Sequence, residues 1–139
     1  MTIQHSLLSK IHIGPGLPRL PQDFMFGVAT ADHQCEPYDP DVEDIRDKWE
    51  REKGQTMRGR ATDFRNRFQE DVDLARQLGC KMFRFSISWS RIEPAPGVFS
   101  KADFDFYRRL IDAITRRAWS RSSRCITLCG RCTSKHAGG

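Results

Sequence analysis

Apolar and polar positions along the chain predict two strands separated by a helix. Residues 24–30 (FMFGVAT) form a short apolar run, which is typical of a buried strand. Residues 81–87 (KMFRFSI) alternate, so that Phe83 and Phe85 share one face of a strand while Arg84 lies on the other. The first strand is predicted to be buried, and the second to have one apolar face.

The spacing of apolar residues predicts amphipathic helices after both strands. The first begins at a cap on Asp63 and ends near Gly79, which suits a left-handed C-cap. The second begins at the capping-box pair Ser100 and Asp103. A shorter helix is expected over residues 44–51. The expected apolar face of the first helix is Phe68, Val72, Ala75 and Leu78, and that of the second is Phe104, Tyr107, Leu110, Ile111 and Ile114.

This order of elements predicts an α/β fold. A strand, a long polar loop (residues 32–60), a helix, a second strand and a second helix form two βα units, whose strands must be parallel with right-handed crossovers. A long irregular stretch after a strand is usually functional or disordered. Two βα units cannot close a sheet, so the architecture is expected to be incomplete.

The charge pattern divides the chain near residue 117. The last 24 residues hold six Lys/Arg and no acidic residue, whereas 17 basic and 18 acidic residues precede them. The formal charge of +5 therefore comes entirely from this tail. We expect three regions: a loose leader over residues 1–20, a folded part over residues 21–117, and a basic, Cys-rich, disordered tail over residues 118–139.

Composition and cysteine usage favour a cytoplasmic protein. The start of the chain lacks an apolar run of signal-peptide length, and no run approaches the roughly 18 residues that would span a bilayer. Cys35 and Cys80 are the only cysteines before the tail, which fits a reducing compartment better than a disulfide framework. We expect no cofactor, no bound metal, and neither a membrane nor a nucleic acid as partner.

Four segments resemble glycoside hydrolase family 1, the β-glucosidase family. FMFGVATADHQCE (residues 24–36) is similar to the family's first strand and the loop after it, and FRFSISWSRIEPAPGVF (residues 83–99) to its second strand and loop. The helices FQEDVDLARQLGCK (residues 68–81) and ADFDFYRRLIDAI (residues 102–114) are similar to those that follow each strand. Together the resemblance covers about residues 20–117.

The resemblance implies the first two βα units of a (β/α)₈ TIM barrel with its active site at the C-terminal ends of the strands. It also implies a retaining β-glycosidase that hydrolyses O-glycosyl bonds of β-glycosides through two Glu, a nucleophile and an acid/base. In the family these Glu stand in motifs resembling NEP and ENG, and neither tripeptide occurs here. We therefore expect no catalytic residue in this chain, an inactive fragment, and the remainder of the barrel as a possible partner.

Gln34 matches the Gln that binds sugar in the family. An amide both donates and accepts hydrogen bonds, as a sugar hydroxyl does. The spacing of an isolated loop Gln alone favours a solvated side chain, whereas the strand before Gln34 and the matching motif around it favour substrate binding.

Arg84 lies on the strand face opposite Phe83 and Phe85, which are expected under the helices. It should therefore point into the barrel, where a lone cation is costly unless a carboxylate pairs with it. The matching Arg in the family contacts the nucleophile, so the resemblance implies a nucleophile-supporting role. A structural salt bridge within the barrel is compatible with that role.

Other residues of the family motifs are expected to be structural. Residues 89–91 (WSR) should serve loop packing and ion pairing, and Glu36 is given no catalytic role. The family usually has an aromatic residue before the Gln and a Gly after the Glu, but His33 and Pro37 stand there in this chain. This departure suggests an outlying branch and leaves the sugar preference open.

The tail also permits two functions of another class, in which the protein binds a ligand and is not an enzyme. Cys125, Cys129, Cys132 and His136 supply three thiolates and an imidazole, which is a possible zinc set. The Arg/Ser-rich residues 116–124 suit nonspecific contacts with phosphate groups. The alternative is thus a small zinc- or nucleic-acid-binding protein built on the tail.

A frameshift accounts for more features of the tail. In the family the chain continues with a peptide similar to GMEPLVTLHHF. One freely chosen set of codons for that peptide, read from the second base, translates as AWSRSSRCIT, which is the sequence of residues 118–127. GC-rich codons read out of frame also yield Arg, Ser, Cys, Ala and Gly. We interpret residues 118–139 as the third strand and its surroundings in the wrong frame.

Overall fold

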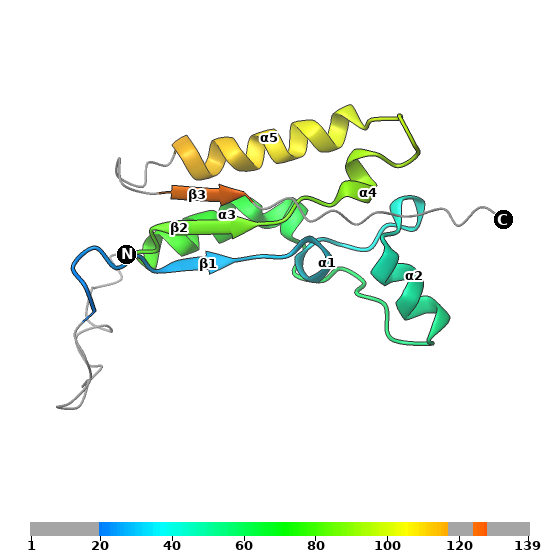
Figure 1. The fold of residues 1–139 in the computed structure, drawn as a ribbon, viewed down its shortest axis with the longest axis horizontal. Coiled ribbons are helices and arrows are strands. Elements are labelled where there is room, and N and C mark those ends of the chain that lie inside the picture. The colour runs from blue at the N-terminus through cyan, green and yellow to red at the C-terminus, as the bar shows by residue number, and fades with distance from the viewer. Residues whose placement is uncertain (1–19, 117–123, 128–139) are drawn as a thin grey trace.

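The computed structural model describes residues 20–116 and the backbone of residues 124–127. These residues form a parallel sheet of three strands in the order β1-β2-β3 (Figure 1). The strands are β1 (Gly27–Ala29), β2 (Met82–Phe85) and β3 (Arg124–Thr127). The predicted α/β class and the parallel pairing of the first two strands are confirmed.

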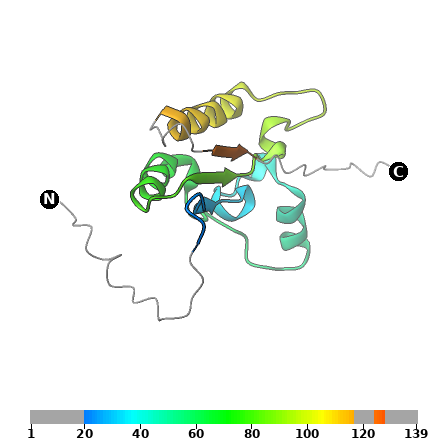
Figure 2. The ribbon, with the colours of Figure 1, turned by 60° about the vertical axis from the view of Figure 1, so that its left-hand side comes forward.

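Two long helices cover the sheet and the shorter ones lie beyond the C-terminal ends of the strands. Figure 1 and, after rotation, Figure 2 show α3 and α5 beside the strands, with α1, α2 and α4 at the end to which the arrows point. No helix in the part of the chain described here is long and apolar enough to cross a bilayer. The helices are α1 (Asp32–Cys35), the 3-10 helix η2 (Pro40–Val42), α2 (Ile45–Glu52), α3 (Phe64–Gln77), α4 (Trp89–Ile92) and α5 (Lys101–Arg116).

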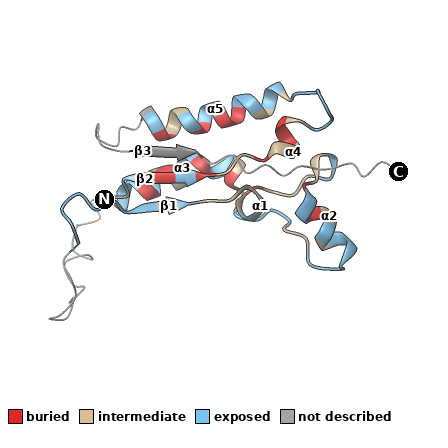
Figure 3. Ribbon diagram, viewed as in Figure 1, coloured by how far each residue is buried: buried red, intermediate tan, exposed pale blue. Residues whose placement is uncertain are grey.

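The two faces of the sheet differ in burial, as the alternation in β2 predicts. Phe83 and Phe85 are each 1% exposed and belong to the core, against which Val28 of β1 packs. Arg84 and its register partner Ala29 lie on the opposite face and are exposed (Figure 3). The helices therefore cover one face of the sheet, and the face that carries Arg84 is open among the described residues.

The core joins β2 to α3 and α5. The rings of Phe64 and Phe83 stack at 6.4 Å, and those of Phe68 and Phe106 meet edge to face at 5.6 Å. Burying such aromatic side chains is the main favourable contribution to folding here. The buried apolar residues are Phe64, Phe68, Val72, Ala75, Phe83, Phe85, Ile92, Phe106, Tyr107, Leu110 and Ile114.

The apolar face predicted for α5 is wrong at two positions. Phe104 is 50% exposed and Ile111 38% exposed, whereas Phe106, which was not on the predicted face, is buried. The apolar surface of α5 is wider than the part that meets the core: Phe106, Tyr107, Leu110 and Ile114 are buried, whereas Phe104 and Ile111 lie at its margin and line an open groove.

The first strand is shorter and less buried than its composition predicts. Phe24 and Phe26 lie before β1, contact each other at 5.0 Å and are about half exposed. β1 is an outer strand here, and no described segment covers its far side. Gly27 packs so closely that an added Cβ would lie 2.8 Å from Cβ and O of Met82.

The ends of α3 match the prediction in position but not in every contact. Asp63 precedes the helix with a φ of 56°, and its carboxylate accepts hydrogen bonds from Arg60 and Asn66 instead of capping the helix amides. Gly79 has a φ of 78°, as the predicted left-handed C-cap requires. Leu78, which was predicted on the apolar face, is the C-cap residue and is 64% exposed, so the prediction is wrong at this position.

A capping box begins α2, and half of the predicted one begins α5. Before α5, Oγ of Ser100 accepts from the Asp103 amide and donates to the Asp103 carboxylate, but the Ser100 amide donates to the carbonyl of Ile92 and not to Asp103. Before α2, Oδ1 of Asp44 accepts from the amide of Asp47, and Oδ2 of Asp47 accepts from the amide of Asp44. Both helix starts are thus fixed by paired hydrogen bonds.

Four residues of the tail form a strand. Residues 124–127 are β3, which pairs with β2 from Met82↔Arg124 to Phe85↔Thr127. The backbone of β3 thus satisfies amides and carbonyls that the edge of β2 would otherwise leave unpaired. The leader and the other tail residues lie outside the described part of the chain.

Candidate functional site

Gln34 lies on α1, just beyond the C-terminal end of β1, with its side chain exposed. Asp32 fixes α1 to the segment after β2, because Oγ of Ser86 donates to Asp32 Oδ1 (2.6 Å) and accepts from the Asp32 amide (2.8 Å). Within residues 20–116 the Gln34 side chain has no hydrogen-bond partner, so its amide is available to a ligand.

Arg84 projects from the middle of the open sheet face. Its carbonyl accepts a 2.9 Å hydrogen bond from the amide of Thr30, which ties β2 to the residue after β1. No acidic side chain of the described residues lies within ion-pair distance of its guanidinium. The structure therefore places Gln34 and Arg84 on adjacent βα units, with both side chains unpaired within those residues.

A buried carboxylate connects the two loops behind this end of the sheet. Glu36 is 1% exposed. Its Oε1 accepts a 2.6 Å hydrogen bond from Tyr107 of α5, and its Oε2 accepts from Arg65 of α3 (3.2 Å). Arg65 also pairs with Asp103, and its guanidinium lies 4.1 Å from the ring centre of Phe106.

Arg91 completes this buried network and has the structural role that the sequence predicts. Its Nε lies 3.3 Å from Oε2 of Glu36. Its two Nη atoms donate to Asp39 (3.1 Å) and to the carbonyl of Pro37 (2.6 Å). The loop after β1 is thereby held against α4, and Glu36 is occupied by internal partners, consistent with the absence of a catalytic role.

Burial controls the protonation of this network. Desolvation raises the pKa of Glu36, although the hydrogen bond from Tyr107 and the charges of Arg65 and Arg91 act in the opposite direction. Burial, together with the neighbouring Glu36, raises the pKa of Tyr107 far above its usual range. The phenol therefore remains a hydrogen-bond donor at neutral pH.

His33, the residue beside Gln34, lies in a second cluster. Its Nδ1 is 2.9 Å from Oδ2 of Asp44 and 3.8 Å from Oδ1 of Asp47, and its Nε2 is 2.9 Å from Oε1 of Glu50. Arg58 contacts the same acidic pair, with Nη2 at 2.7 Å from Oδ2 of Asp47. The cluster holds α2 against α1.

The two aspartates of this cluster differ in their response to burial. Desolvation raises the pKa of Asp47. Desolvation also acts on Asp44, but the hydrogen bond from the Asp47 amide and the contact with His33 outweigh it, so the pKa of Asp44 is lowered. Sequence reasoning missed this cluster, although the three-residue spacing of Asp44, Asp47 and Glu50 places them on one side of α2.

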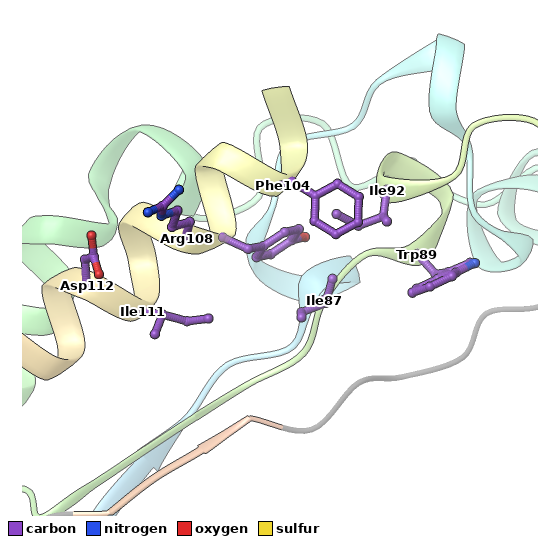
Figure 4. A pocket seen from close by; sticks show the side chains of 8 residues that line it. Ile87, Trp89, Ile92, Phe104, Arg108, Ile111 and Asp112 are labelled. Carbon is purple, nitrogen blue, oxygen red and sulfur yellow. The ribbon is translucent and has the colours of Figure 1, made fainter. Parts of the chain in front are cut away.

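An apolar groove of about 350 Å³ lies between α5 and the segment after β2. Figure 4 shows Ile87, Trp89 and Ile92 on one side and Phe104, Arg108, Ile111 and Asp112 along α5 on the other. Few polar groups line it, which distinguishes it from a sugar-binding cleft. On the α5 side, the groove is lined by the exposed apolar residues Phe104 and Ile111.

The alternative sites proposed on the tail are not placed by the structure. Cys125 belongs to β3, of which only the backbone is described, while Cys129, Cys132 and His136 lie outside the described residues. The zinc set and the phosphate-binding stretch therefore stay predictions.

A parallel sheet with helices on one face defines an α/β protein. The family model of glycosyl hydrolase family 1 matches residues 18–124. The chain therefore belongs to glycosyl hydrolase family 1.

Individual relatives support this assignment. The chain is 44% identical over 109 residues to Beta-glucosidase 1B of Phanerodontia chrysosporium, covering 71% of this chain and 20% of that protein. It is 39% identical over 108 residues to a beta-glucosidase of Agrobacterium sp., covering 71% and 23%. The chain thus spans about a fifth to a quarter of the length of these relatives.

Solved structures agree with the sequence relatives. The family 1 β-glucosidase of Thermotoga maritima superposes with a TM-score of 0.67 at 30% identity, covering 84% of this chain and 27% of that one. The beta-glycosidase BGL167 superposes with a TM-score of 0.66 at 36% identity, covering 78% and 25%. The fold of the described residues is that of this family.

Proposed function

We propose that this chain forms the first sector of the sugar-binding site of a retaining β-glycosidase and lacks the catalytic pair. The observation that carries the proposal is the placement of Gln34 and Arg84 on adjacent βα units of a family 1 fold, both exposed and both without a side-chain partner among the described residues. Both carboxylate oxygens of the buried Glu36, behind the same loops, already accept hydrogen bonds from Tyr107 and Arg65, whereas the exposed side chains of Gln34 and Arg84 are available to a substrate or to a later strand.

Each residue has a defined chemical task in this proposal. The amide of Gln34 bridges two adjacent hydroxyls of a β-glycoside, donating to one and accepting from the other. The guanidinium of Arg84 pairs with the nucleophilic carboxylate contributed by a later strand and keeps it ionised and oriented. The hydrogen bonds between Asp32 and Ser86 hold α1, and with it Gln34, at a fixed height above β2.

The catalytic Glu pair is absent from the sequence of the chain, because neither an NEP nor an ENG tripeptide occurs in it. We therefore propose that the 139 residues alone do not hydrolyse glycosides. The open face that carries Arg84 and the apolar groove beside α5 are the surfaces that the rest of a barrel covers. Activity then requires that the remaining strands and helices of the barrel be supplied by a separate polypeptide.

The roles of the two residues are tested in such a complemented enzyme. We expect Gln34→Ala to raise KM and lower kcat for an aryl β-glucoside, and Arg84→Met to lower kcat while also shifting the acidic limb of the pH profile. Lys81→Met, which removes a cation from an exposed site just before β2, is the matched control for Arg84→Met and should leave both constants within about twofold. Unchanged kcat and KM in the Gln34 and Arg84 variants would contradict the proposed roles of both residues.

We also propose that residues 118–139 are encoded out of frame. Support comes from the match of residues 118–127 to a shifted reading of the family's third strand, and from β3 lying where a third strand is needed. Sequencing of the DNA beyond codon 117 tests this. A second frame that continues through the third strand to NEP- and ENG-like motifs is expected, and its absence would favour a genuine tail.

A further inference from the structure

The start of α2 leaves two carboxylate oxygens directed at one ring nitrogen of His33. In each aspartate one oxygen is used by the capping box, Oδ1 of Asp44 by the amides of Arg46 and Asp47, and Oδ2 of Asp47 by the amide of Asp44. The remaining oxygens, Asp44 Oδ2 and Asp47 Oδ1, lie 2.9 and 3.8 Å from Nδ1 of His33. Backbone hydrogen bonds therefore preorganise the two carboxylate oxygens that face Nδ1 of His33.

One of these atoms has no hydrogen-bond partner. Asp47 is completely buried, and its Oδ1 accepts no hydrogen bond within the described residues. A proton between His33 and Asp44 satisfies that pair but leaves Asp47 Oδ1 unpaired, which is costly in a buried position. A cation bound to all three atoms satisfies them together.

Glu50 occupies the position of a supporting carboxylate. Its Oε1 lies 2.9 Å from Nε2 of His33, on the opposite side of the ring from the two aspartates. Histidine ligands of metals usually donate their second ring N–H to a carboxylate, which fixes the tautomer and the orientation of the ring. The arrangement leaves the lone pair of His33 on Nδ1, where the aspartate oxygens converge.

Distances and charge select the kind of ion. The ligand atoms that the three residues offer lie within 4.8 Å of one another. The two distances from Nδ1 of His33, 2.9 and 3.8 Å, lie on either side of the roughly 3.4 Å edge of a tetrahedron with bonds of about 2.1 Å. Three carboxylates against the single guanidinium of Arg58 leave a formal charge of −2 when His33 is neutral, which a divalent ion balances. One nitrogen and two carboxylate oxygens suit Zn²⁺, with water as the fourth ligand.

We propose that His33 Nδ1, Asp44 Oδ2 and Asp47 Oδ1 form a structural Zn²⁺ site that fastens α2 to α1, the helix that carries Gln34. The site is separate from the Cys/His set of the tail, and it does not depend on the chain being part of a glycosidase.

Zn²⁺ titration of the full chain tests the proposal once the tail thiols are excluded. In a chain carrying Cys125→Ser, Cys129→Ser and Cys132→Ser, competition with a chromophoric chelator should give one Zn²⁺ per molecule. X-ray absorption should show nitrogen and oxygen ligands without sulfur. No binding by this chain would overturn the proposal.

Substitutions then locate the ion. We expect His33→Gln and Asp47→Asn to weaken Zn²⁺ binding by more than about 100-fold, and Glu50→Gln by roughly 10- to 100-fold, as for other supporting carboxylates. Glu52→Gln removes an equal charge from an exposed position of the same helix and should change the affinity by less than about twofold. Equal affinities in all four variants would contradict the assignment.

A measurement on the His33 ring does not depend on the folding of variants. In ¹⁵N spectra of the Cys-substituted chain, added Zn²⁺ should move Nδ1 of His33 to the position of a metal-bound nitrogen while Nε2 stays protonated. Zn²⁺ bound with both ring nitrogens unchanged would place the ion elsewhere and refute the site.

Discussion

The phenol of Tyr107 donates a 2.6 Å hydrogen bond to Oε1 of Glu36 across 71 positions of sequence. The same phenol oxygen accepts a 2.8 Å hydrogen bond from the amide of Ser88. One buried side chain of α5 therefore joins the loop after β1 to the loop after β2. These loops carry the candidate site, so its geometry depends on a residue that does not belong to it.

Tyr107→Phe should lower the free energy of unfolding by about 1–3 kcal/mol, because it leaves the Ser88 amide and one oxygen of the buried Glu36 without a partner. Chemical denaturation measures this loss. Tyr38→Phe is the matched control, since its phenol donates to Glu43 at a less buried position, and it should cost well under half as much. Equal losses in the two variants would show that the Tyr107 network does not hold the loops together.

Stability should depend on pH through Glu36. Burial raises its pKa above the ordinary value of 4.5, so the folded chain binds this proton more tightly than the unfolded chain. The contribution of Glu36 is therefore most favourable below 4.5 and declines as the pH rises through the raised pKa. Glu36→Gln removes this decline.

The free energy of unfolding is measured for the native chain and for Glu36→Gln at intervals from about pH 4 to 7. The difference between the two isolates the contribution of Glu36 from those of the other titrating groups. We expect the native chain to lose stability relative to the variant as the pH rises. A relative gain over the same interval would mean that the charges of Arg65 and Arg91 outweigh desolvation.

The apolar groove beside α5 should make the chain self-associate. Ile111→Lys places a charge at the groove and should reduce association in light-scattering or sedimentation measurements, while unfolding stays within about 0.5 kcal/mol because Ile111 is partly exposed. Thr115→Lys adds the same charge at an exposed position one turn further along α5. If both substitutions reduce association equally, net charge and not the groove controls it.

Sequence alone predicted those features that depend on local periodicity. The alternation of Phe83, Arg84 and Phe85 fixed the two faces of β2, and the φ of Gly79 followed from its place after α3. The prediction that Phe104 is buried is wrong. Periodicity gives the width of an apolar surface, but it does not say which part of that surface packs against the rest of the core.

The polar networks could not be predicted, because they join segments that approach only in the folded chain. Glu36 and Tyr107 are far apart in sequence, and the contact of His33 with Asp44 requires that α2 turn back onto α1. β3 was missed for a related reason. Its backbone pairs with the edge of β2, a long-range contact that local periodicity does not reveal.

We propose that this chain supplies part of a glycosidase site without the groups that perform hydrolysis. Release of the aryl group from an aryl β-glucoside measures it directly, with the chain alone and after mixing with a separately produced polypeptide that carries the later strands of a family 1 enzyme. We expect no turnover above background by the chain alone and measurable turnover after mixing. Turnover by the 139-residue chain on its own would contradict it.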